Sequence, residues 1–444
     1  MSTELSGVRV AVAGAGLAGL CAARDLEAAG AQVVVLEARS RVGGRVRTIR
    51  SGLADGQHGE AGADLIEEEQ NLVLELASDL RLKTVTILRG GFGFYGCDRK
   101  GRRRIHNGVA GFTDASRRLE REIADYQLAG RRWDSAVAES LGSRSVARWM
   151  NDIDAPPDLK SRLRGLRGFF LADPEDLSLL ALVDQFASNG APGRGRVYRI
   201  AGGNDRLTRG IAQRLKGALV LNAAVRGIRQ HTRGVRIAFE ERGRRRELTA
   251  DYAVLAIPTT TLRHVAFEPP LPVDQQRAIG TLKYGAATRM LLQFARPFWR
   301  RALRPRAFGT DLPLGAVWDA SEHQPGRAGI LSLLAGGRAS AELRAITARE
   351  GAEGLTARLR WLGKPALLLN APFVSWESEE WSRGGYACFD PAFDPKLRAW
   401  LARPAGRLLF AGEHTSFESQ GYMNGAIASG KRAAAEVRAL HSNR

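Results

Sequence analysis

A short apolar run that ends in closely spaced glycines constrains the fold of this chain more than any other feature. The run covers residues 8–13, and apolar side chains at helical spacing follow over residues 17–29. A second apolar run covers residues 32–36 and ends at Glu37. This is the pattern of a β-α-β unit of about 30 residues, which typically binds a dinucleotide. The sequence therefore predicts an α/β fold with a Rossmann-like domain that begins near the N-terminus.

The glycines of this unit and its acidic residue each suit a dinucleotide. Gly14 permits a tight turn, Gly16 lets the backbone approach a pyrophosphate, and Gly19 allows the helix to pack closely on the strand. The N-terminus of the helix offers unpaired N–H groups to the phosphates. The carboxylate of Glu37 can accept hydrogen bonds from the hydroxyls of the adenosine ribose. An ordinary glycine-rich turn is the alternative, and the position of Glu37 counts against it.

Two further glycine-rich segments extend this prediction. Gly43, Gly44 and Arg45 follow the second strand, and such a loop can pass close to a diphosphate and add a bidentate cation. Near the other end of the chain, residues 412–416 read Gly-Glu-His-Thr-Ser and residues 421–426 read Gly-Tyr-Met-Asn-Gly-Ala. We expect this C-terminal segment to close over the far end of the same cofactor. Together the segments indicate FAD rather than NAD.

The patterns between these segments predict insertions into the dinucleotide fold. Turn residues and aromatic residues over 83–108 indicate hairpin strands, and residues 113–186 have helical patterns. We therefore expect a Rossmann-like FAD-binding domain that is assembled from discontinuous segments, with an inserted α+β substrate-binding domain. The FAD-binding domain is expected to comprise residues 1–82, 197–286 and 396–444, and the substrate-binding domain residues 83–196 and 287–395.

Composition is that of a globular protein without a membrane span. Hydrophobic residues make up 44% of the chain, and no stretch approaches the roughly 20 apolar residues that cross a bilayer. The N-terminus lacks the layout of a secretory signal, so we expect a cytoplasmic protein without membrane association. The three cysteines are far apart, and neither they nor the seven histidines form a metal-ligand motif. We therefore expect neither a disulfide nor a metal site.

The formal net charge of +19 is unusual, and most of it comes from arginine. Basic clusters occur at residues 99–104 and 242–246. Attraction to polyanions or anionic substrates is one interpretation of these clusters. Solvated hairpin turns are the favoured one, since neither cluster contains interleaved aromatic residues or lies in a recognisable nucleic-acid-binding module. Nucleic acid is accordingly not an expected partner.

The ordered set of motifs resembles the flavin-containing amine oxidase family, which includes monoamine oxidases, polyamine oxidases, L-amino-acid oxidases and histone demethylases. The resemblance implies hydride transfer from the carbon next to an amine nitrogen to flavin N5. The imine product would then hydrolyse to a carbonyl compound, and oxygen or another acceptor would reoxidise the flavin. The matching stretches are residues 14–45, 62–80, 224–258, 284–294, 376–386 and 410–434.

The resemblance also implies roles for individual residues. Glu37 would bind the adenosine ribose, and the backbone of Val225 would face the adenine. Gly62 and Ala63 would pass near the reactive edge of the isoalloxazine, and the N–H of Met423 would face flavin N1/O2, where a helix N-terminus stabilises negative charge. Arg39, Gly44 and Arg45 would lie along the pyrophosphate and flavin, and Glu413 would bind the ribityl chain. The expected cofactor-binding residues are Gly14, Gly16, Gly19, Glu37, Arg39, Gly43, Gly44, Arg45, Gly62, Ala63, Val225, Trp376, Gly412, Glu413, Tyr422 and Met423.

The cofactor supplies the reactivity in this chemistry, so no nucleophilic triad is needed. The expected catalytic residues are Tyr422, Arg289 and Tyr386. Tyr422 matches one wall of the aromatic cage that guides a neutral amine to the flavin. Trp376, Trp381 and Tyr386 belong to a segment that lines the flavin in relatives, although packing in the core is the alternative for each.

Three departures from the family pattern qualify these expectations. Arg289 stands where many relatives have a lysine that is hydrogen-bonded through water to flavin N5, and arginine keeps the charge without the geometry. A dehydrogenase that uses an acceptor other than oxygen is therefore an alternative. Tyr386 stands where covalent relatives have a flavin-linking cysteine, and Cys388 is two residues away, so we expect non-covalent FAD. Amino-acid oxidases often use an arginine near the flavin-edge loop to hold the substrate carboxylate, but here this loop contains Asp64, Glu67, Glu68 and Glu69. An acidic loop favours a cationic substrate, and solvated carboxylates in the first turn of a helix explain it equally well.

The leading hypothesis is an FAD-dependent oxidase or dehydrogenase of primary or secondary amines. An L-amino-acid oxidase is the second hypothesis, with Arg89, Arg289 or another arginine binding the substrate carboxylate. Less favoured are a carotenoid-desaturase-like or protoporphyrinogen-oxidase-like flavoenzyme and a basic, non-catalytic flavoprotein. The sequence permits a homodimer without requiring one.

Overall fold

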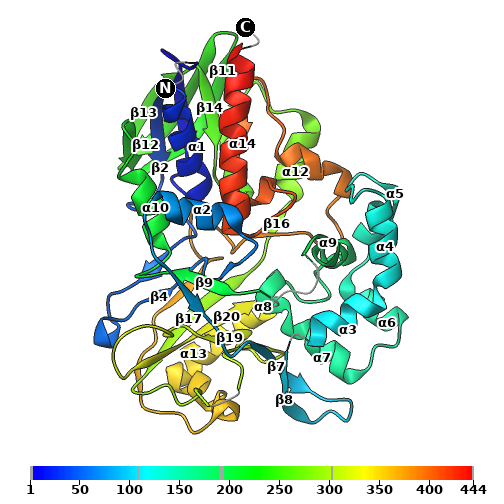
Figure 1. Cartoon of the computed structure of the whole chain (residues 1–444). Coiled ribbons are helices and arrows are strands. Elements are labelled where there is room, and N and C mark those ends of the chain that lie inside the picture. The colour runs from blue at the N-terminus through cyan, green and yellow to red at the C-terminus, as the bar shows by residue number, and fades with distance from the viewer. Residues whose placement is uncertain (1–3, 109, 190–194, 302–303, 443–444) are drawn as a thin grey trace.

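Five parallel strands from distant parts of the sequence form the central sheet of the protein (Figure 1). The structure is a computed structural model that describes residues 4–108, 110–189, 195–301 and 304–442. The strand order is β10-β2-β1-β14-β24. The strands are β1 (Arg9–Ala13), β2 (Gln32–Glu37), β10 (Ala218–Leu221), β14 (Tyr252–Leu255) and β24 (Leu408–Phe410). β1 and β14 are buried at almost every position, as expected for parallel strands that are covered on both faces. The chain therefore has the α/β architecture that the N-terminal motif predicts.

Helices cover one face of this sheet. The first and last helices of the chain, α1 (Leu17–Ala28) and α14 (Met423–Ser442), lie side by side (Figure 1). A Cβ on Gly430 would lie 2.2 Å from the carbonyl oxygen of Ala18, so the helices reach this separation because residue 430 is glycine. The other helices of this layer are α2 (Asn71–Asp79) and α10 (Asp205–Ala212).

A second sheet, of order β13-β12-β11-β15, packs against the opposite face. Its strands are β11 (Ala223–His231), β12 (Gly234–Glu241), β13 (Arg244–Ala250) and β15 (Ala266–Glu268). Ile228 and Ile237 are buried in one cluster with Leu36 of β2. The basic residues 242–246 lie at the hairpin turn between β12 and β13 and are exposed. The helices α11 (Thr259–Leu262) and α12 (Val273–Thr281) follow in the sequence.

A large sheet joins segments from two parts of the chain, in the order β21-β17-β20-β19-β18-β7-β8 with β22 also paired to β17. Its strands are β7 (Phe92–Cys97), β8 (Arg103–Asn107), β17 (Ala287–Phe294), β18 (Ala307–Thr310), β19 (Ala316–Asp319), β20 (Gly329–Gly336), β21 (Leu368–Asn370) and β22 (Phe373–Ser375). The parallel pairing of β18 with β7 connects the two segments. α13 (Arg338–Ala357) packs on this sheet (Figure 1). The other basic cluster, residues 99–104, lies around the turn between β7 and β8.

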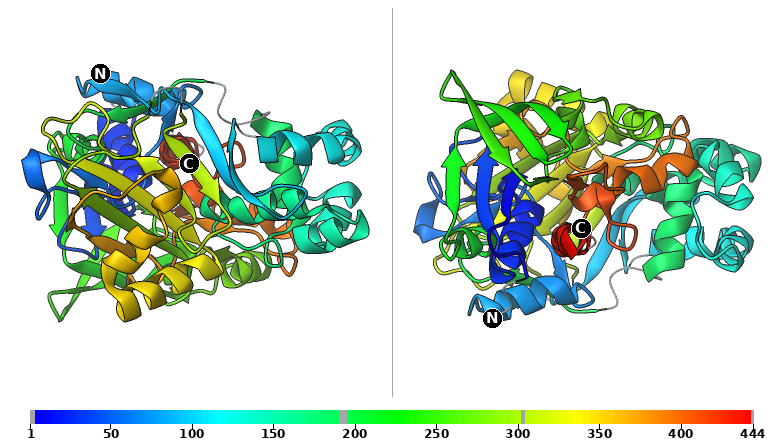
Figure 2. Two further views of the ribbon diagram at one scale, coloured as in Figure 1. Left: turned by 90° about the horizontal axis from the view of Figure 1, so that it is seen from below. Right: turned by 90° about the horizontal axis from the view of Figure 1, so that it is seen from above.

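A group of helices lies to one side of the two main sheets (Figures 1 and 2). They are α3 (Ala110–Arg118), α4 (Glu120–Leu128), α5 (Ala136–Gly142), α6 (Val146–Asp152), α7 (Pro157–Gly165), α8 (Arg167–Phe170) and α9 (Leu179–Asn189). Ser135 and Ser145 cap α5 and α6 by accepting hydrogen bonds from backbone N–H groups, and Pro157 begins α7. The apolar faces of the helices meet around the buried Trp149 and Tyr126.

Small sheets connect these layers. The short strands are β3 (Thr48–Ile49), β4 (Gly59–Glu60), β5 (Ile66–Glu67), β6 (Thr84–Ile87), β9 (Val197–Ile200), β16 (Lys283–Tyr284) and β23 (Ala387–Cys388), and the 3-10 turns are η1 (Ala54–Gly56), η2 (Arg360–Leu362), η3 (Pro395–Leu401) and η4 (Glu413–Thr415). Among the described ranges, none of the helices combines the length and apolar character that a membrane crossing requires. The same ranges contain no cluster of three or more His, Cys, Asp or Glu side chains suited to a metal ion.

Candidate active site

A cavity of about 510 Å³ is lined by both glycine-rich ends of the chain and by the inserted segments. Its volume falls in the range of small-molecule and cofactor sites. All but one of the expected site residues line it: Gly14, Gly16, Glu37, Arg39, Gly43, Gly44, Arg45, Gly62, Ala63, Val225, Arg289, Trp376, Tyr386, Gly412, Glu413, Tyr422 and Met423. Gly19 lies outside this wall, and a Cβ there would be 1.9 Å from the carbonyl oxygen of Gly14. Its place is therefore in the packing of α1 against the loop.

The loop after β1 is shaped for close approach of a ligand to its backbone. Gly14 has a φ of +101°, and a Cβ there would lie 2.7 Å from the carbonyl oxygen of Ala256, so a side chain fits neither the backbone conformation nor the space. No atom of the described residues comes within 4 Å of a Cβ position on Gly16. The loop with Gly43 and Gly44 lies directly beside it, because Gly43 pairs with Gly16 in a parallel bridge. The two glycine-rich loops thus form one continuous surface of the cavity.

Glu37 is held at the end of β2 with part of its carboxylate unused. Its oxygens accept hydrogen bonds from the backbone N–H groups of Ala15 at 2.8 Å and Arg39 at 2.9 Å. Burial raises the pKa of Glu37, and these N–H groups counteract the effect by stabilising the carboxylate. A carboxylate has about four lone-pair sites, so capacity remains for hydroxyl donors in the cavity.

Two arginines, Arg39 and Arg41, follow Glu37 in the sequence, and Arg39 lines the cavity. The Arg39 guanidinium donates to Ser382 Oγ at 2.8 Å and lies 3.5 Å from the carboxylate of Glu379. Burial lowers the pKa of Arg41 to about 10, and the nearby Arg39 adds to the effect. Arg41 was not among the residues expected from the sequence, although it stands in the same arginine- and glycine-rich segment. Its side chain donates to the carbonyl oxygen of Gly44 at 2.9 Å and thereby supports the glycine loop.

The two ends of the chain meet at an ion pair. Arg45 Nη1 lies 2.8 Å from Glu413 Oε1, and the same nitrogen donates to the carbonyl oxygen of Gly385 at 2.8 Å. Glu413 also accepts a hydrogen bond from the N–H of Gly421 at 2.9 Å. Burial opposes ionisation of Glu413, but the Arg45 guanidinium overcomes it and holds the pKa below the usual range. Tyr284 lies under the guanidinium of Arg45, 5.1 Å from its central carbon.

His414, next in the sequence, was not assigned a role from the sequence. Its Nδ1 lies 3.0 Å from the hydroxyl of Tyr284, and burial lowers the pKa of its imidazole to about 4. The ring is therefore neutral near neutral pH. Arg398 donates to the carbonyl oxygens of His414 and Ser416 and fixes this turn.

Arg289 lies at the edge of the cavity beside Gly62. Its guanidinium donates to the carbonyl oxygen of Gly62 at 3.0 Å and to Ser332 Oγ at 2.9 Å, and it stacks on Trp318 with its central carbon 4.4 Å from the ring centroid. The residue is 5% exposed, and burial lowers its pKa to about 10, so the group stays charged near neutral pH. Arg289 is thus fixed on three sides by the protein.

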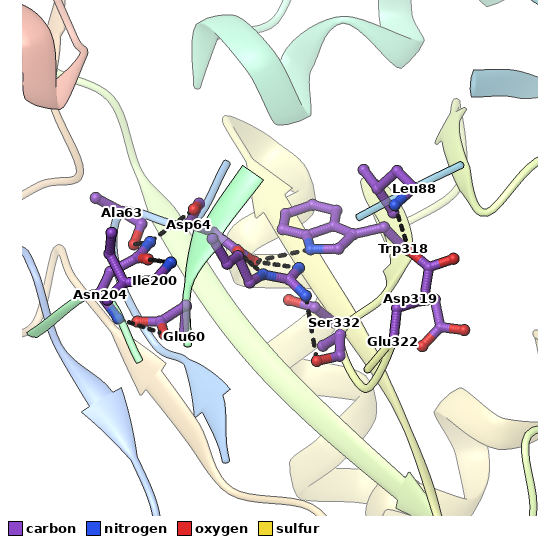
Figure 3. A network of polar contacts seen from close by, with 12 residues as sticks. Glu60, Ala63, Asp64, Leu88, Ile200, Asn204, Trp318, Asp319, Glu322 and Ser332 are labelled. Carbon is purple, nitrogen blue, oxygen red and sulfur yellow. Dashed lines mark hydrogen bonds and ion pairs between the residues drawn. The ribbon is translucent and has the colours of Figure 1, made fainter. Parts of the chain in front are cut away.

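The carboxylate of Asp64, considered from the sequence only as part of an acidic loop, lies next to Arg289. It accepts a hydrogen bond from Trp318 Nε1 at 2.8 Å. Figure 3 shows the network that connects Asp64 to Glu60 through Asn204. Asp64 also forms a buried ion pair with Arg199 and lies 3.8 Å from Arg289. Burial, and then the charge of Asp64, raise the pKa of Glu60 to about 8. The guanidinium groups of Arg199 and Arg289 therefore share the carboxylate of Asp64.

Aromatic side chains line the part of the cavity near Arg289. The hydroxyl of Tyr386 donates to the carbonyl oxygen of Phe169, and the Tyr386 ring lies against Gly421. The Tyr422 ring packs edge-on to Phe169, with 6.4 Å between the centroids. Burial raises the pKa of both tyrosines, so both are neutral phenols. Their surface is apolar and suits an uncharged group.

The other expected residues are placed as follows. Trp376 donates from its indole N–H to the carbonyl oxygen of Ala61 at 2.8 Å and is buried beside Gly62. Trp381 lines the cavity, and its ring lies under the guanidinium of Arg226. Arg226 directly follows Val225 in the sequence. Arg89, expected as one of the carboxylate ligands, is exposed and does not line the cavity.

The parallel sheet with its glycine-rich turn is typical of dinucleotide-binding folds, and the cavity lies beside that turn. The chain belongs to the flavin-containing amine oxidoreductase family, whose model matches residues 17–438. It is accordingly a flavin-dependent oxidoreductase that acts on amines.

Individual relatives agree with this assignment. A protein of Mycobacterium tuberculosis that is named as a flavin-containing monoamine oxidase is 31% identical over 453 residues, covering 98% of this chain and 97% of the relative. Putrescine oxidase of Kocuria rosea is 30% identical over 463 residues, covering 96% and 94%. A solved structure of putrescine oxidase bound to putrescine superposes with a TM-score of 0.83 at 25% identity, covering 97% of this chain and 99% of that one. The fold class predicted from the sequence is confirmed.

Proposed function

We propose that the cavity binds FAD through residues of both glycine-rich ends. The observation that carries this proposal is the ion pair between Arg45 and Glu413, which brings the two ends together on one wall. The open backbone at Gly16 fits a pyrophosphate, and the unused lone pairs of Glu37 fit the ribose hydroxyls. Met423 begins α14, and the N–H groups of a helix start favour negative charge on a bound group.

Within this proposal the residues divide as the resemblance implies. Residues 1–82, 197–286 and 396–444 form the FAD-binding domain, and residues 83–196 and 287–395 form the substrate-binding domain. The cavity wall draws residues from both sets, which supports a site between them.

Binding of FAD is non-covalent in this proposal. The residue beside the flavin edge is Tyr386, whose phenol is protonated and engaged with Phe169. The nearby Cys388 is a poor nucleophile, because burial raises the pKa of its thiol to about 12. Denaturation in acid should therefore release all of the flavin into the supernatant, and flavin that stays with the precipitated protein would contradict this part.

The substrate is a primary or secondary amine that is oxidised at the carbon next to nitrogen, giving an imine that hydrolyses to a carbonyl product. When bound, the flavin accepts the hydride; the protein orients the amine and excludes water. Tyr386 and Tyr422 provide an apolar, aromatic wall for the amine in its neutral form. Glu67 also lines the cavity and supplies an acidic group there, and burial raises the pKa of its carboxyl.

The test of this function is anaerobic mixing of the flavin-loaded protein with a library of amines. Loss of the oxidised flavin absorbance is expected with at least one class of amine. A purified protein without a flavin spectrum, even after addition of FAD, would overturn the proposal. Admission of air to the reduced enzyme then separates an oxidase from a dehydrogenase that needs another acceptor.

An L-amino-acid oxidase is the second candidate, because the cavity wall contains a buried cation at Arg289 that could attract a carboxylate. The pair phenethylamine and L-phenylalanine distinguishes the two candidates, since the second differs only by the carboxylate. Faster flavin reduction by phenethylamine favours the amine oxidase, and faster reduction by phenylalanine favours the amino-acid oxidase.

A further inference from the structure

One aromatic ring on the cavity wall is seated among three glycines. Phe94 of β7 lines the cavity and is 7% exposed. A Cβ on Gly96 would lie 2.3 Å from a ring carbon of Phe94, and a Cβ on Gly165 would also lie 2.3 Å from the ring. A Cβ on Gly309 would be in contact with the ring at 3.4 Å. The ring therefore occupies a slot that exists because Gly96 and Gly165 lack side chains, whereas a Cβ on Gly309 would make only an ordinary contact.

The three glycines come from different elements that meet at this point. Gly96 is on the same face of β7 two residues beyond Phe94, Gly165 is the last residue of α7, and Gly309 of β18 pairs with Phe94 across the sheet. β7 and α7 are neighbours in Figure 1. None of the three glycines has a φ in the left-handed region, so at Gly96 and Gly165 the space for the ring, and not the backbone conformation, requires glycine.

Glycine weakens strands and helices, because it loses more conformational freedom on folding than other residues and packs no side chain. Three such positions around one ring indicate that the position of this ring matters. The slot leaves the Phe94 ring little room to move away from a ligand, because the ring lies so close to Gly96 and Gly165 that neither position has space for a Cβ atom.

We propose that Phe94 is a specificity-determining residue that limits the size of the apolar substituent on the amine. Small residues, among them Gly168, Ala307 and Ala316, also line the cavity. An alkyl or aryl group of the substrate that reaches Phe94 contacts a ring of fixed position, and not a side chain that can adopt another rotamer. The proposal rests on the proposed function, since it assumes that the amine binds in this cavity.

The experiment measures the second-order rate constant of anaerobic flavin reduction for straight-chain primary amines from butylamine to decylamine. Wild type and Phe94→Ala are compared across this series. Removal of the ring should move the preferred chain length upward. The ratio of decylamine to butylamine reactivity should rise roughly tenfold or more, since one methylene in an apolar pocket is worth about that factor or more.

Tyr95→Ala is the matched control. Tyr95 is the next residue of the same strand and does not line the cavity, because its ring stacks on Trp361 at 4.3 Å on the other face. This variant also removes a ring from β7, and it should leave the chain-length preference unchanged. An equal shift in Tyr95→Ala would assign the effect to general loosening of the strand and reject the proposal.

Gly165→Ala provides the opposite change. Its new methyl group would overlap the ring and displace it toward the cavity, so the preference should move to shorter amines. The double variant Phe94→Ala with Gly165→Ala fills part of the vacated slot and should have a preference between those of wild type and Phe94→Ala. If Phe94→Ala does not fold, Gly165→Ala decides: a preference for shorter amines supports the proposal, and an unchanged one rejects it.

The outcomes separate this proposal from the proposed function. If no amine reduces the flavin of wild type, the proposed function fails. If amines reduce the flavin and folded Phe94→Ala retains the wild-type chain-length profile, only the role of Phe94 fails.

Discussion

The side chains of Arg45 and Glu413, 368 residues apart in the sequence, form an ion pair of 2.8 Å inside the protein. Because both are largely buried, removal of one charge leaves the other without a partner. Glu413→Gln should therefore lower stability by about 3–5 kcal/mol, the usual cost of breaking a buried pair. It should also weaken retention of the flavin.

Chemical denaturation and the flavin content of the purified variant measure these effects. Glu418→Gln is the control, since Glu418 is exposed and its contact with Arg131 is 3.5 Å long. An exposed pair contributes about 0–1 kcal/mol. Equal losses in the two variants would show that the Arg45 contact has no special importance.

Arg289→Lys tests the electron acceptor. The guanidinium is fixed by Gly62, Ser332 and Trp318, whereas a lysine there would be a mobile ammonium that can give up a proton. Under the resemblance, this is the arrangement of relatives with a lysine near flavin N5. We expect faster reoxidation by oxygen in Arg289→Lys than in wild type, measured by stopped-flow after anaerobic reduction.

Arg289→Gln is the companion variant, because it removes the charge and keeps a side chain that can donate hydrogen bonds. It should not reproduce the gain. A wild-type enzyme that already reacts with oxygen as fast as Arg289→Lys would contradict the expected gain and count against the dehydrogenase alternative.

Glu60 predicts a pH dependence of stability. Its pKa is about 8 in the folded protein, well above the ordinary value of 4.5, so the folded state binds a proton that the unfolded state releases between these values. The stabilisation from this proton is complete below about pH 4.5 and is lost as the pH rises through about 8. Glu60→Gln resembles the protonated form and can keep the contacts with Asn204 and Thr48.

The unfolding midpoint of Glu60→Gln relative to wild type should therefore rise between pH 5 and pH 9. Thermal unfolding at fixed ionic strength measures the difference. A constant difference across this range would mean that Glu60 titrates normally.

Tyr422 tests the aromatic wall. Tyr422→Phe keeps the ring and should retain most of the activity toward amines. Tyr422→Ala removes the ring, and misplacement of the substrate by about 1 Å can cost roughly a hundredfold in rate. The expected result is a large fall in the limiting rate of flavin reduction for Tyr422→Ala alone, and similar losses in both variants would assign the effect to the hydroxyl instead.

The glycine-rich loops could be predicted because their signals are local. Gly14, Gly16 and Glu37 lie within one β-α-β unit, where the spacing of glycines and apolar residues specifies the turn, the helix and the strand end. The C-terminal segment was recognised in the same way. The pairing of Asp64 with Arg199 gave no such signal, because a single acidic or basic residue in a strand or loop does not reveal its partner.

The sequence by itself determined the class of fold, the flavin chemistry and the segments that line the cavity. Only the tertiary structure decided which side chains meet there: Arg289 with Asp64 and Trp318, Arg45 with Glu413, and the ring of Phe94 with its three glycines. The physical reason is that these contacts depend on the register of strands such as β7, β17 and β18 and on the approach of distant helices. Local periodicity specifies an element and its buried face, whereas the partner across the sheet is set by the packing of the whole chain.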